Sequence, residues 1–478
     1  MILNILFILN LFQNAYSFEY FGFIPELKAN LKSNSSFDFK TNCFDINLSL
    51  NGTHLNFYSS NRQKFICGDT FLFGNHYRID TKTILLEGNS TIKLENKTDV
   101  EQNDINYYGM NIFWFKNGFM ESFANLYLTS KMFSGTPNEV EKNNLNFLKE
   151  KMNYEYKFWN KTVDFQEDEI KSGDYLAINR LDGLDPIIMW GTGSYIGHAA
   201  IALRINGELY ICESTDKNPF GESYWPPPYG IIKTPYNKWI KQAKKANYLV
   251  SIIRLDDEHQ KLFDTNIDKV VSHFNSLEGL PYGYNNFLFG WIDTLENNFP
   301  EPLTKELLSL SIAALDRGKN KDIVDKFIIE GLNKRINLNR LTYEPLKLNY
   351  SEIVEETIKR NTSIYDLYTI PENDDWVYST GKSLVCDSLV LSLYKKAGIF
   401  DEIDNKLQAT EFTPRDSYEI KIFNDNWKTK KCMNKGIFCQ IMGKYQMELS
   451  DINSINMYKN MNEKCETKPP DYIRNKNC

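Results

Sequence analysis

The sequence predicts an α+β protein with a β-rich N-terminal domain, a mixed central region with a helical insertion, and a polar C-terminal tail. Short β-type runs separated by Asn, Gly and Asp turns fill the first part of the chain. From Ile170 onward, strand-like runs and helical patterns follow one another. With 478 residues, 42% of them hydrophobic, the chain has enough apolar material for two or three cores.

The first 17 residues predict a signal peptide. The short apolar run from Met1 to Phe12 precedes Ala15 and Ser17, small residues that suit cleavage before Phe18. No Lys or Arg precedes this run, and a buried N-terminal strand is the alternative interpretation. We therefore expect a secreted protein or one in the endolysosomal lumen.

Sequons and cysteines agree with this expectation. Glycosylation sequons occur at Asn34, Asn47, Asn51, Asn89, Asn96, Asn160, Asn349 and Asn361. Of the eight cysteines, four lie in the polar tail, at Cys432, Cys439, Cys465 and Cys478, where we expect disulfides to compensate for a small core. Cys43 and Cys67 are a further candidate pair. Cys212 and Cys386 remain, both in apolar central segments.

Charge and hydropathy argue against some partners. The formal net charge is -7 and the pI is about 5.5, so no basic surface for nucleic acid is expected. After the N-terminal run, no segment is long and apolar enough to predict a membrane helix, and we expect no stable membrane anchor. The sequence does not indicate an oligomeric state.

The predicted boundaries follow from these patterns. After the signal peptide we expect a β-rich domain at 18–135, with a small sandwich as the simplest arrangement, and a linker at 136–169. The central domain should span 170–425, with a helical insertion at about 296–375 that is either a lid or a packing domain. The cysteine-containing tail is 426–478.

A β-hairpin is the most informative local feature. Two β-type runs flank Asn206 and Gly207, a pair that favours a two-residue turn and so sets the register. In that register His198 and Glu213 are diagonal neighbours on one face, and Cys212 lies on the other. A carboxylate bound to one imidazole nitrogen leaves the other nitrogen to activate a nucleophile. The alternative is a buried His198 satisfied by Thr215, with Glu213 exposed.

The candidate nucleophile is Cys386. It lies near the start of a helix predicted from Ser383 to Lys396, where the helix dipole and free amide groups lower a thiol pKa. We therefore expect Cys386 to be unusually reactive. A small buried hydrophobic residue is the alternative interpretation.

These segments together resemble the permuted papain-fold cysteine hydrolases of the NlpC type, also called YiiX-like. Residues 173–178 look like the opening strand of that family, 197–201 like its His-bearing strand, and 210–214 like its acidic strand. Residues 279–284 resemble its Gly-x-x-Tyr-Asp element, and 384–390 its Cys-Ser-Glu-Leu-Val helix. The resemblance covers about 170–399 and implies a circularly permuted papain-like core with its site residues in the order His, Glu, Cys.

The resemblance also implies a mechanism. Cys386 would attack a carbonyl, His198 would act as base and then acid, Glu213 would orient His198, and the Cys386 amide would donate to the oxyanion. Relatives cleave amide bonds in peptides or peptidoglycan or move acyl groups on lipids, so the expected substrate is a peptide, a peptidoglycan-like compound or a lipid acyl group. Asp387 stands where the family tends to have Ser, and Gly283 where it tends to have Asp. The rival hypothesis is an inactive scaffold that serves as a binding glycoprotein, for which a Cys212–Cys386 disulfide would be the clearest sign.

Two further residues are candidates for substrate binding. Tyr282 is a second candidate contributor at the oxyanion. Trp225 lies in an aromatic, proline-rich loop at 221–230 that either lines a substrate groove or forms a surface turn. The other histidines have no spacing typical of metal ligands, so we expect neither a metal nor a cofactor.

Overall fold

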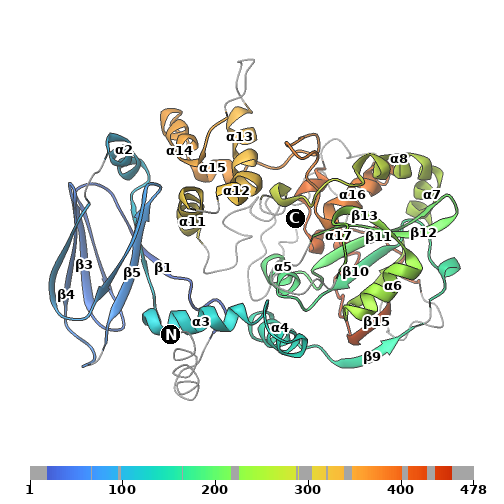
Figure 1. The fold of residues 1–478 in the computed structure, drawn as a ribbon, viewed down its shortest axis with the longest axis horizontal. Coiled ribbons are helices and arrows are strands. Elements are labelled where there is room, and N and C mark those ends of the chain that lie inside the picture. The colour runs from blue at the N-terminus through green and yellow to red at the C-terminus, as the bar shows by residue number, and fades with distance from the viewer. Residues whose placement is uncertain are drawn as a thin grey trace. The chain divides into compact units, whose positions relative to one another are not determined.

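The fold is mixed α and β in a computed structural model of the chain, which confirms the predicted class (Figure 1). The structure describes residues 19–65, 67–94, 98–163, 165–216, 225–286, 289, 304–318, 321–338, 347–400, 407–427 and 437–454. The predicted signal peptide therefore lies outside the described residues. The chain forms two compact units: unit 1 is 1–131 with 301–367, and unit 2 is 132–300 with 368–478.

Unit 1 contains two four-stranded antiparallel sheets that share one apolar core. Strands alternate buried and exposed side chains, as in β3, where Ile46, Leu48 and Leu50 point inward against Phe71 and Phe73. One sheet has the order β1 (Glu26–Leu31), β8 (Met110–Trp114), β5 (Asp69–Asn75) and β6 (Arg78–Ile84). The other has the order β2 (Ser35–Lys40), β3 (Asp45–Asn51), β4 (His54–Ser60) and β7 (Gly88–Lys93). The small predicted sandwich is confirmed.

Helices complete unit 1, and most of them come from the predicted insertion. They are α2 (Asp99–Tyr107), α3 (Gly118–Ser130), α11 (Lys305–Arg317), α12 (Lys321–Val324), α13 (Glu330–Asn337), α14 (Tyr350–Lys359) and α15 (Ile364–Tyr368), with a π-helical turn at Asp325–Ile329. Leu307 and Leu310 of α11 pack on Phe113 of β8. The insertion therefore divides differently from the prediction, because its apolar faces complete unit 1 and not the central domain.

Unit 2 is built on a seven-stranded antiparallel sheet that positions the candidate site. Its strands, in spatial order, are β13 (Gly230–Pro235), β12 (Glu208–Thr215), β11 (His198–Ile205), β10 (Tyr175–Asn179), β14 (Leu249–Ile253), β15 (Cys439–Tyr445) and β9 (Phe158–Thr162). Strand β9 comes from the predicted linker and β15 from the predicted tail. Both boundary predictions therefore differ from the structure, because the two segments pair as the last two strands of this sheet. The first half of β15 is buried in the core, whereas β9 is mostly exposed.

Helices cover both faces of this sheet. On one face, α16 (Cys386–Lys396) and α8 (Ile267–Leu277) pack against Ala199, Ile201 and Cys212. On the other face, α6 (Tyr236–Lys245) packs against Ala200, Ala202 and Ile211. The remaining elements are α4 (Pro137–Met152), α5 (Leu184–Thr192), α7 (Asp257–Thr265), α17 (Pro414–Glu419), and short 3-10 turns at Glu167–Glu169 and Ala409–Glu411.

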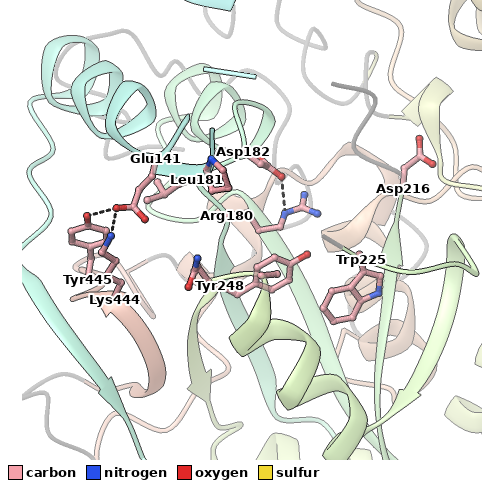
Figure 2. A pocket seen from close by; sticks show the side chains of 12 residues that line it. Glu141, Arg180, Leu181, Asp182, Asp216, Trp225, Tyr248, Lys444 and Tyr445 are labelled. Atoms are coloured by element: carbon pink, nitrogen blue, oxygen red, sulfur yellow. Dashed lines mark hydrogen bonds and ion pairs between the residues drawn. The ribbon is translucent and has the colours of Figure 1, made fainter. Parts of the chain in front are cut away.

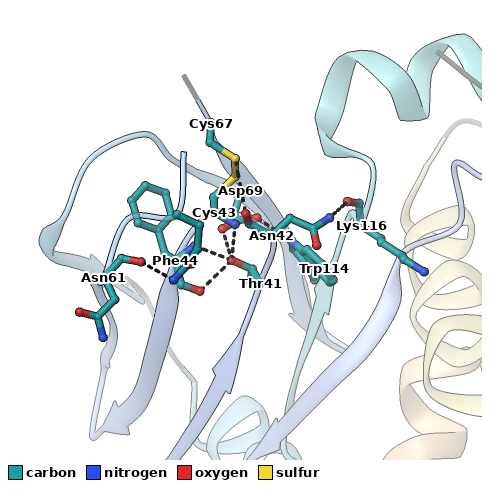
Figure 3. The surroundings of a disulfide bond; sticks show 10 residues. Thr41, Asn42, Cys43, Phe44, Asn61, Cys67, Asp69, Trp114 and Lys116 are labelled. Atoms are coloured by element: carbon teal, nitrogen blue, oxygen red, sulfur yellow. Dashed lines mark hydrogen bonds between the residues drawn. A yellow bond between two sulfur atoms is a disulfide. The ribbon is translucent and has the colours of Figure 1, made fainter. Parts of the chain in front are cut away.

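The two disulfide predictions can be compared with the described cysteines. Cys43 and Cys67 are bonded, as expected, beside Thr41 and Trp114 in unit 1 (Figure 3). Cys439 is also in a disulfide, while the other three cysteines of the predicted tail lie outside the described residues. Cys212 and Cys386 are free. Within the described part of the chain, no helix meets the length and apolarity that a membrane span requires.

Candidate functional site

The predicted hairpin forms with the predicted register. Ile205 pairs with Glu208 and Ala202 with Ile211 around the turn at Asn206 and Gly207, both of which have positive φ. His198 and Glu213 consequently share a face, and the His198 Nε2 to Glu213 Oε2 distance is 2.8 Å. Both side chains are 1% exposed. The alternative of an exposed Glu213 is therefore wrong.

Glu213 is held by a second donor. Trp239 of α6 donates its indole N–H to the other carboxylate oxygen, Oε1, at 2.8 Å. With one oxygen on Trp239 and the other on His198, the Glu213 carboxylate fixes the orientation of the imidazole. Because Nε2 faces this carboxylate, Nδ1 is the ring nitrogen left for a proton transfer.

Cys386 is the first residue of α16, so the helix begins three residues later than the predicted Ser383 and Cys386 lies in its first turn, as expected. The turn before it is fixed by side chains: Ser388 Oγ accepts from the Val385 amide at 2.8 Å and donates to Asn286 Oδ1 at 2.8 Å. The Ala199 amide of β11 donates a hydrogen bond to the Cys386 sulfur. Ala199 directly follows His198, but successive strand residues point to opposite faces, so the His198 ring points to the α6 face, away from the thiol.

The ionisation of Cys386 differs from the expectation. Burial and then the Asp387 carboxylate raise the pKa of the thiol well above its usual range, while the Ala199 amide and Arg180 act in the opposite direction. The side chain is only 3% exposed. The prediction of a lowered thiol pKa, made from the helix N-terminus and a nearby imidazolium, is therefore wrong, because burial of the sulfur outweighs the helix dipole.

Asp387, the next residue, is also unusual. Burial, opposed by its own amide and by the Cys386 thiol, raises the pKa of Asp387 to about 8. The thiol lies 3.6 Å from Oδ1 of this carboxyl group. Oδ2 is buried and has no hydrogen-bond partner among the described residues.

Tyr282 lies at the same place. A small cavity of about 30 Å³ is lined by Tyr282, Cys386 and Asp387, together with Ile188, Thr192, Asn286, Val385, Phe412, Thr413 and Pro414. Burial, Cys386 and Asp387 raise the pKa of the Tyr282 phenol well above its usual range. The structure thus brings Tyr282 to Cys386, where the sequence predicted it.

Position 283 has room only for a glycine. Gly283 donates its amide to the Leu384 carbonyl at 3.1 Å, and a Cβ at this position would overlap the Leu384 backbone. The aspartate that the resembled family tends to have at this position would not fit here without moving the chain next to Cys386.

Trp225 lies in a separate pocket of about 50 Å³ (Figure 2). It is buried and stacks on Tyr248 with ring centroids 5.4 Å apart. Arg180 and Asp182 line the same pocket. Trp225 is therefore buried, while the prolines at 226–228, which follow it in the loop, are exposed, and Trp225 does not line the cavity beside Cys386.

A charged cluster was not predicted from the sequence; it surrounds Arg180, a residue that lines the Trp225 pocket and also acts on Cys386. Arg180 donates from Nε and Nη2 to the same Asp185 oxygen, Oδ1, at 3.0 and 2.6 Å, and its Nε lies 3.5 Å from Asp182. Burial and Asp185 raise the pKa of Asp182, and Arg180 and His198 oppose this rise. The His198 side chain thus acts on the pKa of Asp182, and the Arg180 guanidinium acts on the pKa of Cys386. The signal in the sequence was weak: Gly197, whose missing Cβ makes room for Asp185.

A second constellation, in unit 1, has the side chains of a serine triad. His76 Nδ1 lies 2.6 Å from Asp104, and His76 Nε2 lies 2.9 Å from Ser309 Oγ. All three side chains are buried, and the Ser309 hydroxyl is also bonded to Tyr350. We interpret this group as a structural bridge between the sandwich and α11, because a substrate carbonyl has no access to Ser309.

Among the described residues, no group of three or more His, Cys, Asp or Glu side chains is arranged to hold a metal ion. Cys212 lies on the sheet face opposite His198, as the hairpin register predicts. Cys386 packs on the same face of the sheet as Ala199 and Cys212, whereas His198 and Glu213 lie on the face covered by α6. Among the described contacts, none joins the Cys386 thiol to the His198 ring, so the structure does not bring the three predicted site residues together. In comparisons with protein-family models, curated proteins and solved structures, nothing matches the chain.

Proposed function

We propose that unit 2 is a cysteine hydrolase with a circularly permuted papain-like core that cleaves amide or acyl-ester bonds. The observation that carries the proposal is a buried thiol at the first residue of α16, beside a strand whose first residue, His198, is held by Glu213. A nucleophile, a base and an orienting carboxylate are the parts that such chemistry needs. No cofactor or metal is part of the proposal.

The proposed reaction begins with a neutral thiol. Because the Cys386 pKa is raised, the thiolate is not preformed, and the thiol proton must pass to a base as the sulfur attacks the carbonyl carbon. His198 Nδ1 is the proposed acceptor, which requires the imidazole to turn around the end of β11 toward the α16 face when substrate binds. The carbonyl electron pair moves to oxygen and then returns, and the leaving group departs with the proton from His198. Water attacks the resulting thioester by the same route in reverse and frees Cys386.

The proposed substrates are peptides, peptidoglycan-like compounds or lipid acyl groups. The cavity at Cys386 has room for about one water molecule, so the substrate must displace neighbouring side chains or approach with a thin acyl group. The pocket lined by Trp225 and Arg180 offers an aromatic face and a cation for the rest of the substrate.

We propose secretion, or delivery to the endolysosomal lumen, as the location. The Cys43–Cys67 disulfide is typical of oxidising compartments. The sequon asparagines Asn34, Asn51, Asn89, Asn160, Asn349 and Asn361 are exposed. N-terminal sequencing of the mature protein should begin at Phe18, and an intact Met1 on an unglycosylated protein would contradict this location.

The second candidate function is an inactive binding glycoprotein on the same scaffold. Its support is the burial of the site, since Cys386 is 3% exposed and His198 is 1% exposed. Against it, Cys212 and Cys386 are both free.

The deciding experiment is hydrolysis of 4-nitrophenyl acetate, peptidoglycan fragments and phospholipids by the secreted protein. We expect Cys386→Ala to abolish turnover of whichever substrate is cleaved. Cys212→Ala, the other free buried cysteine, is the matched control and should keep it. Equal turnover by wild type and Cys386→Ala, or no turnover of any of the three substrates, would favour the binding glycoprotein.

A further inference from the structure

Asp387 has an oxygen atom with an unmet hydrogen bond beside the candidate nucleophile. The side chain is 1% exposed, and Oδ2 has no partner among the described residues. Leaving a buried acceptor unsatisfied is costly, and natural proteins rarely do so without a function. Asp387 borders the cavity that Cys386 and Tyr282 also line. A group that enters this cavity is therefore in reach of the carboxyl group.

We propose that Asp387 is a catalytic residue that, as a neutral carboxylic acid, donates its O–H to the carbonyl oxygen of the substrate. This inference rests on the proposed function, since it concerns the same carbonyl that Cys386 attacks. A second donor is needed there because an oxyanion is stabilised best by more than one hydrogen bond, and the Cys386 amide at the start of α16 is only one. The other nearby amide side chain, Asn286, already accepts from Ser388 and donates to the Thr410 carbonyl.

The surroundings of Asp387 favour its neutral form. The titratable groups that act on it or feel its charge are Cys386 on its own helix, Asp416 of α17, Tyr175 of β10 and Tyr282. None of these four carries a positive charge, and the carboxylate of Asp416 adds to the effect of burial. Arg180 acts on Cys386 and Tyr282. With a pKa raised to about 8, Asp387 carries its proton at neutral pH.

The step is balanced without a further reactant. The sulfur–carbon bond forms, the carbonyl π pair moves onto oxygen, and the thiol proton rests on His198. The Asp387 O–H shortens its hydrogen bond to this oxygen without transferring its proton. When the π pair returns, the leaving group takes the proton from His198, and Asp387 remains neutral throughout.

The hydrogen bond from Asp387 to the oxyanion should depend on pH. Below the pKa of about 8, Asp387 is neutral and donates. Above it, the ionised carboxylate has no proton to donate and repels both the thiolate and the oxyanion. Stabilisation of the oxyanion should therefore be present at neutral pH and be lost as the pH rises through this value.

The test uses acetaldehyde and iodoacetamide on the full chain. Acetaldehyde forms a hemithioacetal with a reactive cysteine and places an oxygen where the oxyanion would lie, and carbon-13 NMR detects the adduct. Iodoacetamide alkylates sulfur by displacing iodide, so its rate reports the thiol alone. The variants are Asp387→Asn, which keeps a donor but cannot ionise, and Asp387→Leu, which has none. Ser392→Ala, farther along α16, is the matched control.

We expect Asp387→Leu to weaken the hemithioacetal by about 100-fold or more, since one oxyanion donor is worth about 10²–10³-fold. Alkylation by iodoacetamide should not fall with it. Asp387→Asn should bind acetaldehyde within about tenfold of wild type and lose the decline above the pKa of about 8. This rescue separates a donor role from simple misfolding.

The failures are distinguishable. If wild-type Cys386 reacts with neither reagent, the proposed function fails. If it is alkylated but forms no hemithioacetal, or if Asp387→Leu binds acetaldehyde as wild type does, the Asp387 proposal is overturned while Cys386 stands. A wild-type adduct that persists unchanged above the pKa of about 8 also overturns it.

Discussion

At the scale of single residues, the neighbours of Cys386 decide how its thiol behaves. A helix N-terminus favours a thiolate, yet burial and Asp387 raise the thiol pKa here. On the face of the sheet away from α16, Trp239 holds the Glu213 carboxylate, and Glu213 holds the His198 ring. The residue types suited to acyl chemistry are thus present, with a base that must take the proton during the reaction.

The thiol pKa is directly testable. Iodoacetamide should modify Cys386 slowly at neutral pH, and the rate should keep rising beyond about pH 8.5, the ordinary thiol value, because the folded protein disfavours the thiolate. Mass spectrometry of the labelled peptide measures it, with the urea-unfolded chain as control. A half-maximal rate below about pH 8.5 in the folded protein would contradict the assignment.

Glu213 should act as a positioning residue. Glu213→Gln removes the charge that stabilises the imidazolium, and we expect kcat/KM to fall by about 10²–10⁴-fold. Trp239→Phe removes only the second hydrogen bond to the carboxylate and is the control. Equal effects of the two variants would mean that the carboxylate has only a structural role.

At the scale of elements, close backbone approaches set the geometry. The hairpin turn at Asn206 and Gly207 sets which side chains share a face, and Gly283 lets its segment lie against Leu384, two residues before Cys386. In unit 1, His76 joins the β5–β6 hairpin to α2 through Asp104 and to α11 through Ser309.

Gly283→Ala should disturb the turn before Cys386. The added Cβ overlaps the Leu384 backbone, and overpacking of this kind costs about 1–3 kcal/mol. Urea unfolding and esterase turnover should both report a loss. Gly318→Ala is the matched control, because its new Cβ meets its nearest atoms at 3.4 Å. If the two variants were equally stable and active, the close approach at Gly283 would have no energetic weight.

His76→Leu should destabilise unit 1 by about 2–4 kcal/mol, because it leaves the buried Asp104 without its partner. Ser309→Ala removes the other hydrogen bond and should cost about 1 kcal/mol. Calorimetry measures both. If His76→Leu kept the wild-type melting temperature, the hydrogen bonds of His76 to Asp104 and Ser309 would not stabilise unit 1.

At the scale of the whole molecule, two compact units are made from four segments of one chain. The chain leaves unit 1 after Lys131, returns at Glu301 and leaves again after Leu367. The helices of the predicted insertion therefore stabilise unit 1, and strands far apart in the sequence, β9 and β15, complete the sheet of unit 2.

The Cys43–Cys67 disulfide should matter to unit 1 more than to the site. The two cysteines are 24 residues apart, and a loop of this length is worth about 3 kcal/mol by chain entropy. The double variant Cys43→Ala, Cys67→Ala should lower the unfolding free energy of unit 1 by about this amount. Turnover at the Cys386 site is the internal control and should not change. A similar loss in unit 2 would contradict the division into two units.

The sequence by itself determined the local features whose causes are local. The Asn206–Gly207 turn sets the hairpin register, period-2 alternation marks the sandwich strands, and Cys386 lies in the first turn of a helix that the sequence predicts. These features follow from backbone preferences and from side-chain alternation within a few residues. The mixed α and β class follows from the same patterns.

Only the tertiary structure decided what depends on distant parts of the chain. The raised pKa of Cys386 requires knowing that helix, sheet and the Tyr282 segment close over the sulfur. The membership of the inserted helices in unit 1, the burial of Trp225, and the places of β9 and β15 are also long-range. Burial is a property of the packed chain, and desolvation outweighs the local helix dipole, so no local pattern reveals it.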